Sequence, residues 1–477
     1  MTEFHSKSGK PGERVLSVVV FSLLFSWMLA FPFEGQILYS LADYYRIEPH
    51  NMVFGAIAAT FAGLLLCGFF IKTMKAARRM LLASLIFCFT ASAVFLFPPS
   101  ALWFPALVSS SFAAGGCVAA WGFYFRSGTP KNQRIKTAAD GLACSNILMI
   151  FLNVAAVHLS PGWGLGCSML ALVAAFLFAL RLPSDDVDSV CPYHEPSGKP
   201  AGIARPLAFL FLFIVVITIN SGLMYQVQGP AFSQLKWLTS WYWAVPYIAA
   251  LFVMRNLPRR VNRSYILYIG IAMIGFSFIF FRIMDRSAAS YLVVDTLMLG
   301  ACGVYDLFWW SILGEMLDFD RNAAKVLGIG LSANVFGVLL GGMIGNAITS
   351  AGLSNPNATM LALAVVCVTL ALLPLLHQRL SALLKDHAYL AEFSEMPPRE
   401  QGIPEHLAKT ARLSERELQV ASLLLQRKTY KMIAGELFIS ENTVKYYVKN
   451  LYAKLEIQNR SQLIDLALHG VGSNTVK

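Results

Sequence analysis

Long apolar stretches recur along most of this chain, and each is long enough to cross a lipid bilayer as a helix. The hydrocarbon core of a bilayer is about 30 Å thick and needs roughly 20 apolar residues in a helix. Only 14% of the residues are charged, whereas an average soluble domain has about 25%. Helices satisfy their own backbone hydrogen bonds in lipid. The pattern therefore predicts an all-α, polytopic membrane protein.

A window of about 20 residues predicts twelve membrane spans. The weakest is 237–254, which is short and contains Pro246. Residues 1–14 precede the first span, and the cytoplasmic loop 182–205 divides the membrane domain 15–376 into halves of six spans, 15–181 and 206–376. The predicted spans lie near 15–35, 52–71, 80–98, 101–125, 137–158, 162–181, 206–228, 237–254, 264–282, 289–313, 325–349 and 358–376.

Lysine and arginine are concentrated in every second loop. The alternate loops hold only Arg46, Lys236, Arg282 and Arg286. Because positively charged loops stay in the cytoplasm, and the span number is even, both termini are predicted to be cytoplasmic, in the cytoplasmic membrane of a bacterium. The basic set comprises Lys7, Lys10, Arg14, Lys72, Lys75, Arg78, Arg79, Arg126, Lys131, Arg134, Lys136, Arg181, Lys199, Arg205, Arg255, Arg259, Arg260, Arg263, Arg321 and Lys325.

Two basic loops occupy matching places in the two halves. "KTMKAARRM" follows the second span and "RNLPRRVNR" follows the eighth, which indicates a duplicated unit. Six plus six spans with this spacing resemble the major facilitator superfamily over about residues 15–376. The glycine and aspartate that this family usually has in the loop after its second span are absent here. The resemblance therefore implies the fold more strongly than coupled transport.

Polar side chains inside apolar spans are costly in lipid and often mark functional sites. Asp295 and Asp306 are eleven residues apart, which is about three helical turns, so they share a face. Asp306 stands among aromatic residues, which either line a ligand cavity or pack against helices and lipid. A structural hydrogen bond is the alternative to a ligand site. The candidates for ligand sensing are Asp306, Asp295, Asn220, Asn146 and Asn334.

Small residues recur every four positions in the eleventh span. Ala333, Gly337, Gly341 and Gly345 fall on one face of a helix, which lets a neighbouring helix approach closely. We interpret this face as a packing surface. Asp140 in the fifth span is interpreted as a residue at the cytoplasmic rim, beside Lys136.

The chain becomes polar after the last span. Residues 377–407 form a linker that contains Pro397, Pro398 and Pro404, and a compact domain of four helices is predicted at 408–477. "LSERELQVASLLLQRK" begins with Ser414 followed by Glu417, the pattern of a capping box. "TYKMIAGELF" and "ISENTVKYYVKNLYAKL" are the second and third helices, and "RSQLIDLALHG" is the fourth.

The third helix of this tail has two distinct faces. Val444, Val448, Leu451 and Leu455 form an apolar stripe at helical spacing. The polar face carries Asn442, Lys445, Tyr446 and Lys449. Such a face either enters the major groove of DNA, where amines reach phosphates and base edges, or is simply solvated.

The tail closely resembles the LuxR-type helix-turn-helix. The resemblance implies a four-helix DNA-binding domain with its recognition helix at Glu441–Leu455, promoter DNA as partner, and dimers on DNA. It implies a phosphate contact for Thr443 and groove-facing positions for Lys445, Tyr446 and Lys449. Three departures are Arg427, Met432 and Tyr447. The matching residues are Leu413, Arg416, Glu417, Leu418, Ile433, Ala434, Leu437, Ser440, Thr443, Val444, Lys445, Lys454, Leu455, Asn459 and Arg460.

The sequence contains no nucleotide-binding loop of the GxxxxGK type and no constellation of nucleophiles or metal ligands, so we expect neither an enzyme nor a cofactor. Three functions remain open. The spans act as the sensor for an unknown small-molecule ligand and control the tail, with RNA polymerase as a further candidate partner. Alternatively, the spans transport a substrate and carry a regulatory tail, or the tail docks onto another protein.

Overall fold

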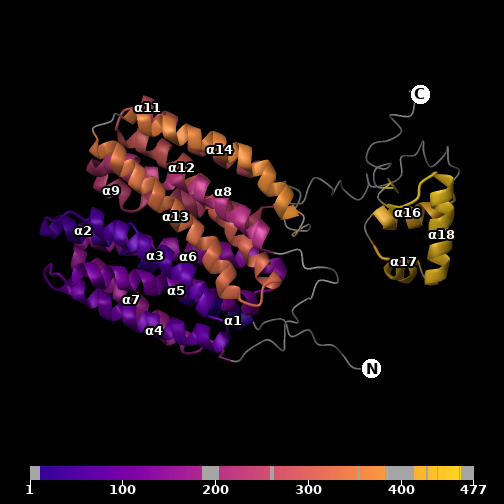
Figure 1. The fold of residues 1–477 in the computed structure, drawn as a ribbon, viewed down its shortest axis with the longest axis horizontal. Coiled ribbons are helices and arrows are strands. Elements are labelled where there is room, and N and C mark those ends of the chain that lie inside the picture. The colour runs from indigo at the N-terminus through magenta and orange to yellow at the C-terminus, as the bar shows by residue number, and fades with distance from the viewer. Residues whose placement is uncertain are drawn as a thin grey trace. The chain divides into compact units, whose positions relative to one another are not determined.

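The structure is a computed structural model that describes residues 11–184, 203–257, 263–351, 355–381, 384, 413–425, 428–437, 439–460 and 462–463. Every regular element in these ranges is helical (Figure 1). The chain divides into two compact units, Met1–Ala391 and Glu392–Lys477. The prediction of an all-α chain, with membrane helices before a helix-turn-helix tail, is confirmed.

The first half of the membrane domain has six long helices and a short helix, α2, after the first of them. The second half repeats this plan with a break in its second long helix. The first half comprises α1 (Pro11–Ala30), α2 (Gln36–Tyr45), α3 (His50–Phe70), α4 (Met74–Ala93), α5 (Trp103–Gly128), α6 (Arg134–Val154) and α7 (Pro161–Ala179). The second half comprises α8 (Ala204–Leu223), α9 (Lys236–Thr239), α10 (Val245–Asn256), α11 (Arg263–Ile283), α12 (Ala288–Met316), α13 (Ala323–Ser350) and α14 (Asn355–Ser381).

The predicted eighth span is not one straight helix. Within the described residues, eleven helices are long and apolar enough to cross a membrane; the segments Pro230–Thr239 and Tyr242–Asn256, which meet at 94°, supply a twelfth span only if they count as one. Pro246 lies in the first turn of α10. Proline fits the first turn of a helix. It does not fit the interior of a helix, because its ring clashes with the preceding turn. The prediction of one continuous helix from residue 237 to residue 254 is therefore wrong.

Two other predicted boundaries, the end of the first span and the end of the last, can be compared with the structure. The first span was expected to reach residue 35, but α1 ends at Ala30, and Glu34 has the left-handed backbone angle φ of 52°, which a helix does not accommodate. The last span is predicted to end at residue 376, followed by a polar segment that can run on as a helix, and α14 continues to Ser381. Helix ends depend on local backbone geometry that hydropathy does not report.

The two halves repeat the same pattern of helix contacts. In the first half, α1 packs against α6 and α7, and α3 packs against α5; in the second half, α8 packs against α13 and α14, and α10 packs against α12. Across the halves, α3 contacts α13 and α6 contacts α10. This repetition agrees with the duplicated unit that the matching basic loops indicate.

The small-residue face of α13 is a packing surface, as the sequence predicts. It lies against α8. A Cβ atom at Gly341 would lie 2.1 Å from the backbone oxygen of Ile219, and one at Gly337 would lie 2.4 Å from that of Val215. Real atoms do not approach so closely, so only glycine permits this contact between helices.

The tail unit has its own apolar core. Its described helices are α16 (Glu415–Leu425), α17 (Tyr430–Leu437) and α18 (Glu441–Lys454). The predicted capping box is confirmed: the Ser414 N–H donates to Glu417 Oε2 at 2.7 Å, and the Glu417 N–H donates to Ser414 Oγ at 3.3 Å. Most of the predicted fourth helix lies outside the described residues. The most deeply buried core residues are Val420, Leu424, Ile433, Val444, Leu451 and Leu463.

Candidate DNA-binding face and membrane cavity

The start of α18 is fixed by a side-chain cap. Ser440 has extended backbone angles, and its Oγ accepts the Thr443 N–H at 3.0 Å. Glu441 follows in the first turn, where the partial positive charge of the helix end favours a carboxylate. A serine before a first-turn glutamate thus sets where the helix begins, and with it which side chains face outward.

Opposite faces of α18 have opposite environments. Val444, Val448 and Leu451 are at most 4% exposed and pack in the tail's core. The predicted groove-facing residues Asn442, Lys445 and Lys449 are exposed, and so is Tyr446, at 62%. Thr443 is half-buried, and its hydroxyl lies 2.7 Å from Ser440 Oγ. The polar face therefore presents two amines, an amide and a phenol to the surroundings.

Two contacts of the tail hold the end of α18 and the turn after it to α16. Lys454 Nζ donates to Glu417 Oε2 at 2.7 Å, and Arg460 Nε donates to the Leu424 carbonyl oxygen at 3.0 Å. Burial alone would raise the pKa of Glu417, but the bonds from Lys454 and the Ser414 N–H hold that pKa below its ordinary 4.5. The carboxylate thus both caps α16 and anchors α18.

The three departures from the LuxR pattern have different positions. Met432 is 57% exposed on α17. Tyr447 is half-buried and packs partly against the tail's core. Arg427 lies outside the described residues.

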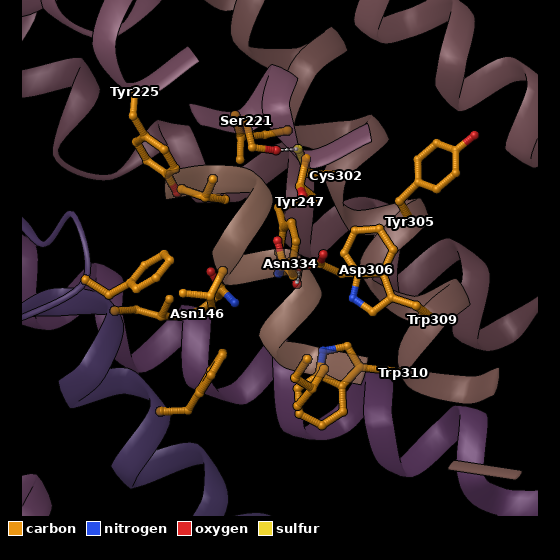
Figure 2. Close-up of a pocket in the computed structure, with 18 of the residues that line it drawn as sticks. Asn146, Ser221, Tyr225, Tyr247, Cys302, Tyr305, Asp306, Trp309, Trp310 and Asn334 are labelled. Atoms are coloured by element: carbon orange, nitrogen blue, oxygen red, sulfur yellow. Dashed lines mark hydrogen bonds between the residues drawn. The ribbon is translucent and has the colours of Figure 1, made fainter. Parts of the chain in front are cut away.

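The membrane domain encloses a cavity of about 130 Å³ between its two halves (Figure 2). Side chains from α1, α3, α5 and α6 line it on one side, and side chains from α8 and α10–α13 line it on the other. Because both halves contribute, any movement of one half against the other changes its shape.

Asp306 is the acidic residue of this cavity. Tyr247 of α10 donates its hydroxyl to Asp306 Oδ2 at 2.6 Å. Asn146 of α6 and Asn334 of α13 also line the cavity, and Figure 2 labels both. Three of the five sequence candidates for ligand sensing are therefore brought together from three helices.

The other two candidates, Asp295 and Asn220, are not among the residues that line the cavity. Asp295 is on the same helix as Asp306 but eleven residues earlier, which is about 16 Å along the axis. It is buried instead near Tyr291. Asn220 is completely buried on α8, while the next residue, Ser221, lines the cavity, because successive residues of a helix point about 100° apart.

Sequence reasoning missed several residues of the cavity. Trp243 and Tyr247 come from the segment "WYWAVPY" at the break before α10, and Tyr225 comes from the π-helical turn Met224–Gln228 after α8. The cluster of aromatic and hydroxyl groups around Pro246 was a usable signal. Glu34, after the end of α1, accepts hydrogen bonds from Tyr39 at 2.5 Å and Gln226 at 3.3 Å, but it is not among the residues that line the cavity.

Several basic residues that were counted only as topology signals also hold the two halves together. Arg134 of α6 is buried, and it donates to the Gly314 carbonyl oxygen at 2.7 Å and to both oxygens of Asp318. Asp140 was expected beside Lys136, but it pairs with Arg14 at 2.7 Å and with Arg255 at 2.5 Å. Arg255 belongs to the second half, so this cluster also crosses between the halves.

The described geometry defines a class: a multi-pass helical membrane domain joined to a helix-turn-helix domain. The family model for bacterial regulatory proteins of the luxR family matches residues 411–467. The spore germination protein GerE of Bacillus subtilis is 50% identical over 52 residues, which are 70% of that protein and 11% of this chain. This chain belongs to the luxR family of bacterial regulatory proteins. The transcriptional regulator MalT of Vibrio cholerae is 38% identical over 76 residues, 8% of its length.

The membrane domain resembles solved transporter structures. The human organic anion transporter MFSD10 (TETRAN) aligns with a TM-score of 0.57 and 15% identity, covering 77% of this chain and 100% of that one. An auto-inhibited peptide transporter of the POT family aligns with a TM-score of 0.52 and 12% identity. This alignment covers 77% of this chain and 96% of that one. At these identities the likeness establishes the fold of the membrane domain alone.

Proposed function

We propose that this protein is a membrane-embedded transcriptional regulator. Its membrane domain senses a small molecule, and its tail binds promoter DNA. The observation that carries the proposal is the outward face of α18, where Lys445, Tyr446 and Lys449 are exposed on a helix whose other face is buried. The same chain holds an internal cavity lined by both halves of its membrane domain.

The distribution of basic loops supports a location in the bacterial cytoplasmic membrane with both termini in the cytoplasm. In that orientation the tail reaches DNA directly. Binding as a dimer is proposed from the resemblance to LuxR-type domains, and RNA polymerase is proposed as the partner on which a bound regulator acts.

Control of the tail requires a ligand that binds two arrangements of the membrane domain with different affinity. The cavity meets one condition for this, because its lining comes from both halves. A second condition is a set of contacts that differ between the two arrangements. The halves are joined by the ion pairs of Arg134 with Asp318 and of Asp140 with Arg255, which must break if the halves separate. We propose that occupancy of the cavity shifts the balance between these arrangements.

The second candidate function is transport, with the tail as a regulatory attachment. Its specific support is the likeness of the membrane domain to two transporter structures. It predicts flux of a substrate across vesicles that contain the protein, whereas a receptor requires none.

The test of the sensor is a map of DNA occupancy by the full-length chain, with and without candidate small molecules. Sites whose occupancy changes with one compound support the proposal. Asp306→Asn should keep the protein in the membrane and keep it on DNA, but should alter the response to that compound. A response that is identical in this variant would place the sensing site elsewhere.

A further inference from the structure

We infer that the membrane cavity binds a small organic monocation, an ammonium group on an apolar body about the size of one ring. The inference deepens the proposed function, since it names the ligand class of the proposed sensor. It depends on the charge of the cavity, on the aromatic rings beside that charge and on the available volume.

The cavity has one formal charge among its described lining residues. Asp306 carries it, and the described lining includes no lysine, arginine or histidine. A carboxylate in an apolar enclosure is costly unless an opposite charge pairs with it. A bound cation supplies that pair, whereas a bound anion would face repulsion from Asp306. The structural likeness to an organic anion transporter therefore does not predict the ligand here.

Aromatic rings stand beside this carboxylate. Trp309 and Trp310 follow Asp306 by three and four residues on α12, so they are its neighbours on the helix surface. Both line the cavity and are at most 3% exposed. The faces of tryptophan rings attract ammonium groups, more strongly where water is excluded.

The rings are also held in place. Trp310 packs edge-on against Phe21, with ring centroids 5.4 Å apart, and Trp309 stacks on Tyr305 at 6.3 Å. A site whose walls are fixed before binding loses less conformational freedom when a ligand enters.

A buried donor in the cavity lacks an acceptor. The indole Nε1 of Trp309 has no hydrogen-bond partner among the described residues, although the side chain is only 2% exposed. Figure 2 shows this nitrogen at the edge of the ring that faces Asp306 in this view. Unpaired buried polar groups are rare and call for an explanation. An ammonium group has no lone pair to accept this bond, so only the π face of the ligand's ring can accept it, and weakly.

The volume sets the size of the ligand. The cavity measures about 130 Å³, and an engineered apolar cavity of about 150 Å³ accommodates benzene. A molecule with one ring and a short amine-bearing arm is therefore the appropriate probe, and larger polycyclic amines are too large for this arrangement of the helices.

The experiment measures binding by isothermal titration calorimetry to the purified full-length chain in lipid nanodiscs. The probes are benzylamine and 2-phenylethylamine, with benzyl alcohol and benzoate as neutral and anionic analogues of matched size. At least one amine should bind, and both analogues should bind at least tenfold more weakly. Quenching of tryptophan fluorescence gives a second readout, since Trp243, Trp309 and Trp310 line the cavity.

The variant Asp306→Asn removes the charge with almost no change of shape, and should weaken amine binding at least tenfold. Asp295→Asn is the matched control, because it makes the same change in a buried aspartate of α12 that does not line the cavity. It should leave amine binding within twofold of the parent. Thermal unfolding of each variant confirms that it is folded.

Failure of this inference is distinguishable from failure of the proposed function. Three results would overturn the inference, even with DNA occupancy intact. They are that neither amine binds the folded parent, that benzoate binds as well as the amines, or that Asp306→Asn binds the amines normally. If the amines bind through Asp306 but the chain occupies no DNA, the inference stands and the proposed function fails.

Discussion

Arg134 and Asp318 join the two halves of the membrane domain through two parallel hydrogen bonds, of 2.9 and 2.8 Å. The Arg134 side chain is only 4% exposed. Such paired bonds fix the relative orientation of both groups. The contact connects the start of α6 to the turn after α12, the helix that carries Asp306.

Asp318→Asn should destabilise the full-length protein by about 3 kcal/mol, because it leaves a buried guanidinium without its charged partner. Thermal unfolding in detergent micelles measures the effect. Asp43→Asn is the control: its pair with Lys236 is about three-quarters exposed on both sides, and we expect a change within about 0.5 kcal/mol. Equal unfolding temperatures for both variants would show that the Arg134 contact contributes no more than a surface pair.

Gly341→Ala should disrupt the packing of α13 against α8. The added Cβ would lie 2.1 Å from the Ile219 backbone oxygen, and separating the helices should cost about 1–3 kcal/mol. Gly166→Ala in α7 is the matched control, since nothing lies within 4 Å of its added Cβ. It should be neutral or slightly stabilising, because alanine favours helix over glycine. Equal stability of the two variants, measured by heat, would contradict the described contact.

The soluble fragment 400–477 should lose stability as the pH falls through the pKa of Glu417 in the folded tail. That pKa lies below the ordinary 4.5. The stabilisation is therefore complete above about pH 4.5, the pKa of the unfolded chain, and disappears as the folded carboxylate gains its proton.

Glu417→Gln should cost the fragment about 1–2 kcal/mol at pH 7 and should flatten the pH dependence between pH 3 and 5. Denaturant unfolding followed by circular dichroism measures both. Glu415→Gln is the control, because that glutamate is exposed in the same first turn of α16. A variant at Glu417 that keeps the parent's pH dependence would assign the effect to another carboxylate.

Reporter fusions should place the central loop and the C-terminus on the same side of the membrane. Fusions after Lys199 and Lys477 should report the cytoplasm, and one after Lys236 should report the outside, because the basic loops alternate along the chain. The broken segment before α10 makes this a sharp test. An exported reporter at Lys477 would mean that this segment does not cross the membrane and that the span number is odd.

The parts of the structure that depend on neighbours in sequence were predictable. The reciprocal cap of Ser414 and Glu417, the start of α18 after Ser440 and its buried stripe follow from residues within one or two helical turns. The small-residue face of α13 is equally local, although its partner, α8, is not.

The composition of the cavity was only partly predictable, because it depends on which helices meet. Asp306 and Asp295 look alike in sequence, and the helical period places both on one face, yet only Asp306 reaches the cavity. The depth of a residue along a helix decides this, and periodicity does not report depth. Likewise, Arg134 counts as a loop charge in a topology analysis, while its partner Asp318 lies 184 residues away.

Lys449→Ala should weaken DNA binding by the soluble fragment 400–477. If Lys449 contacts a base, the loss at the specific site is about 1–3 kcal/mol; if it contacts only phosphate, all sequences lose affinity alike and the salt slope falls by about one. Titrations at several salt concentrations separate these cases. Val444→Asp should unfold the fragment, because it places a charge in a small core.

DNA occupancy in cells by the full-length, membrane-bound chain, compared with that of its Lys445→Ala, Lys449→Ala double variant, tests whether the tail acts on DNA. We predict discrete occupied sites for the parent and their loss in the double variant, with equal amounts of both proteins in the membrane fraction. Identical occupancy by a folded double variant would contradict the account. The tail would then have no groove-facing α18 and would instead be a module that docks onto another protein.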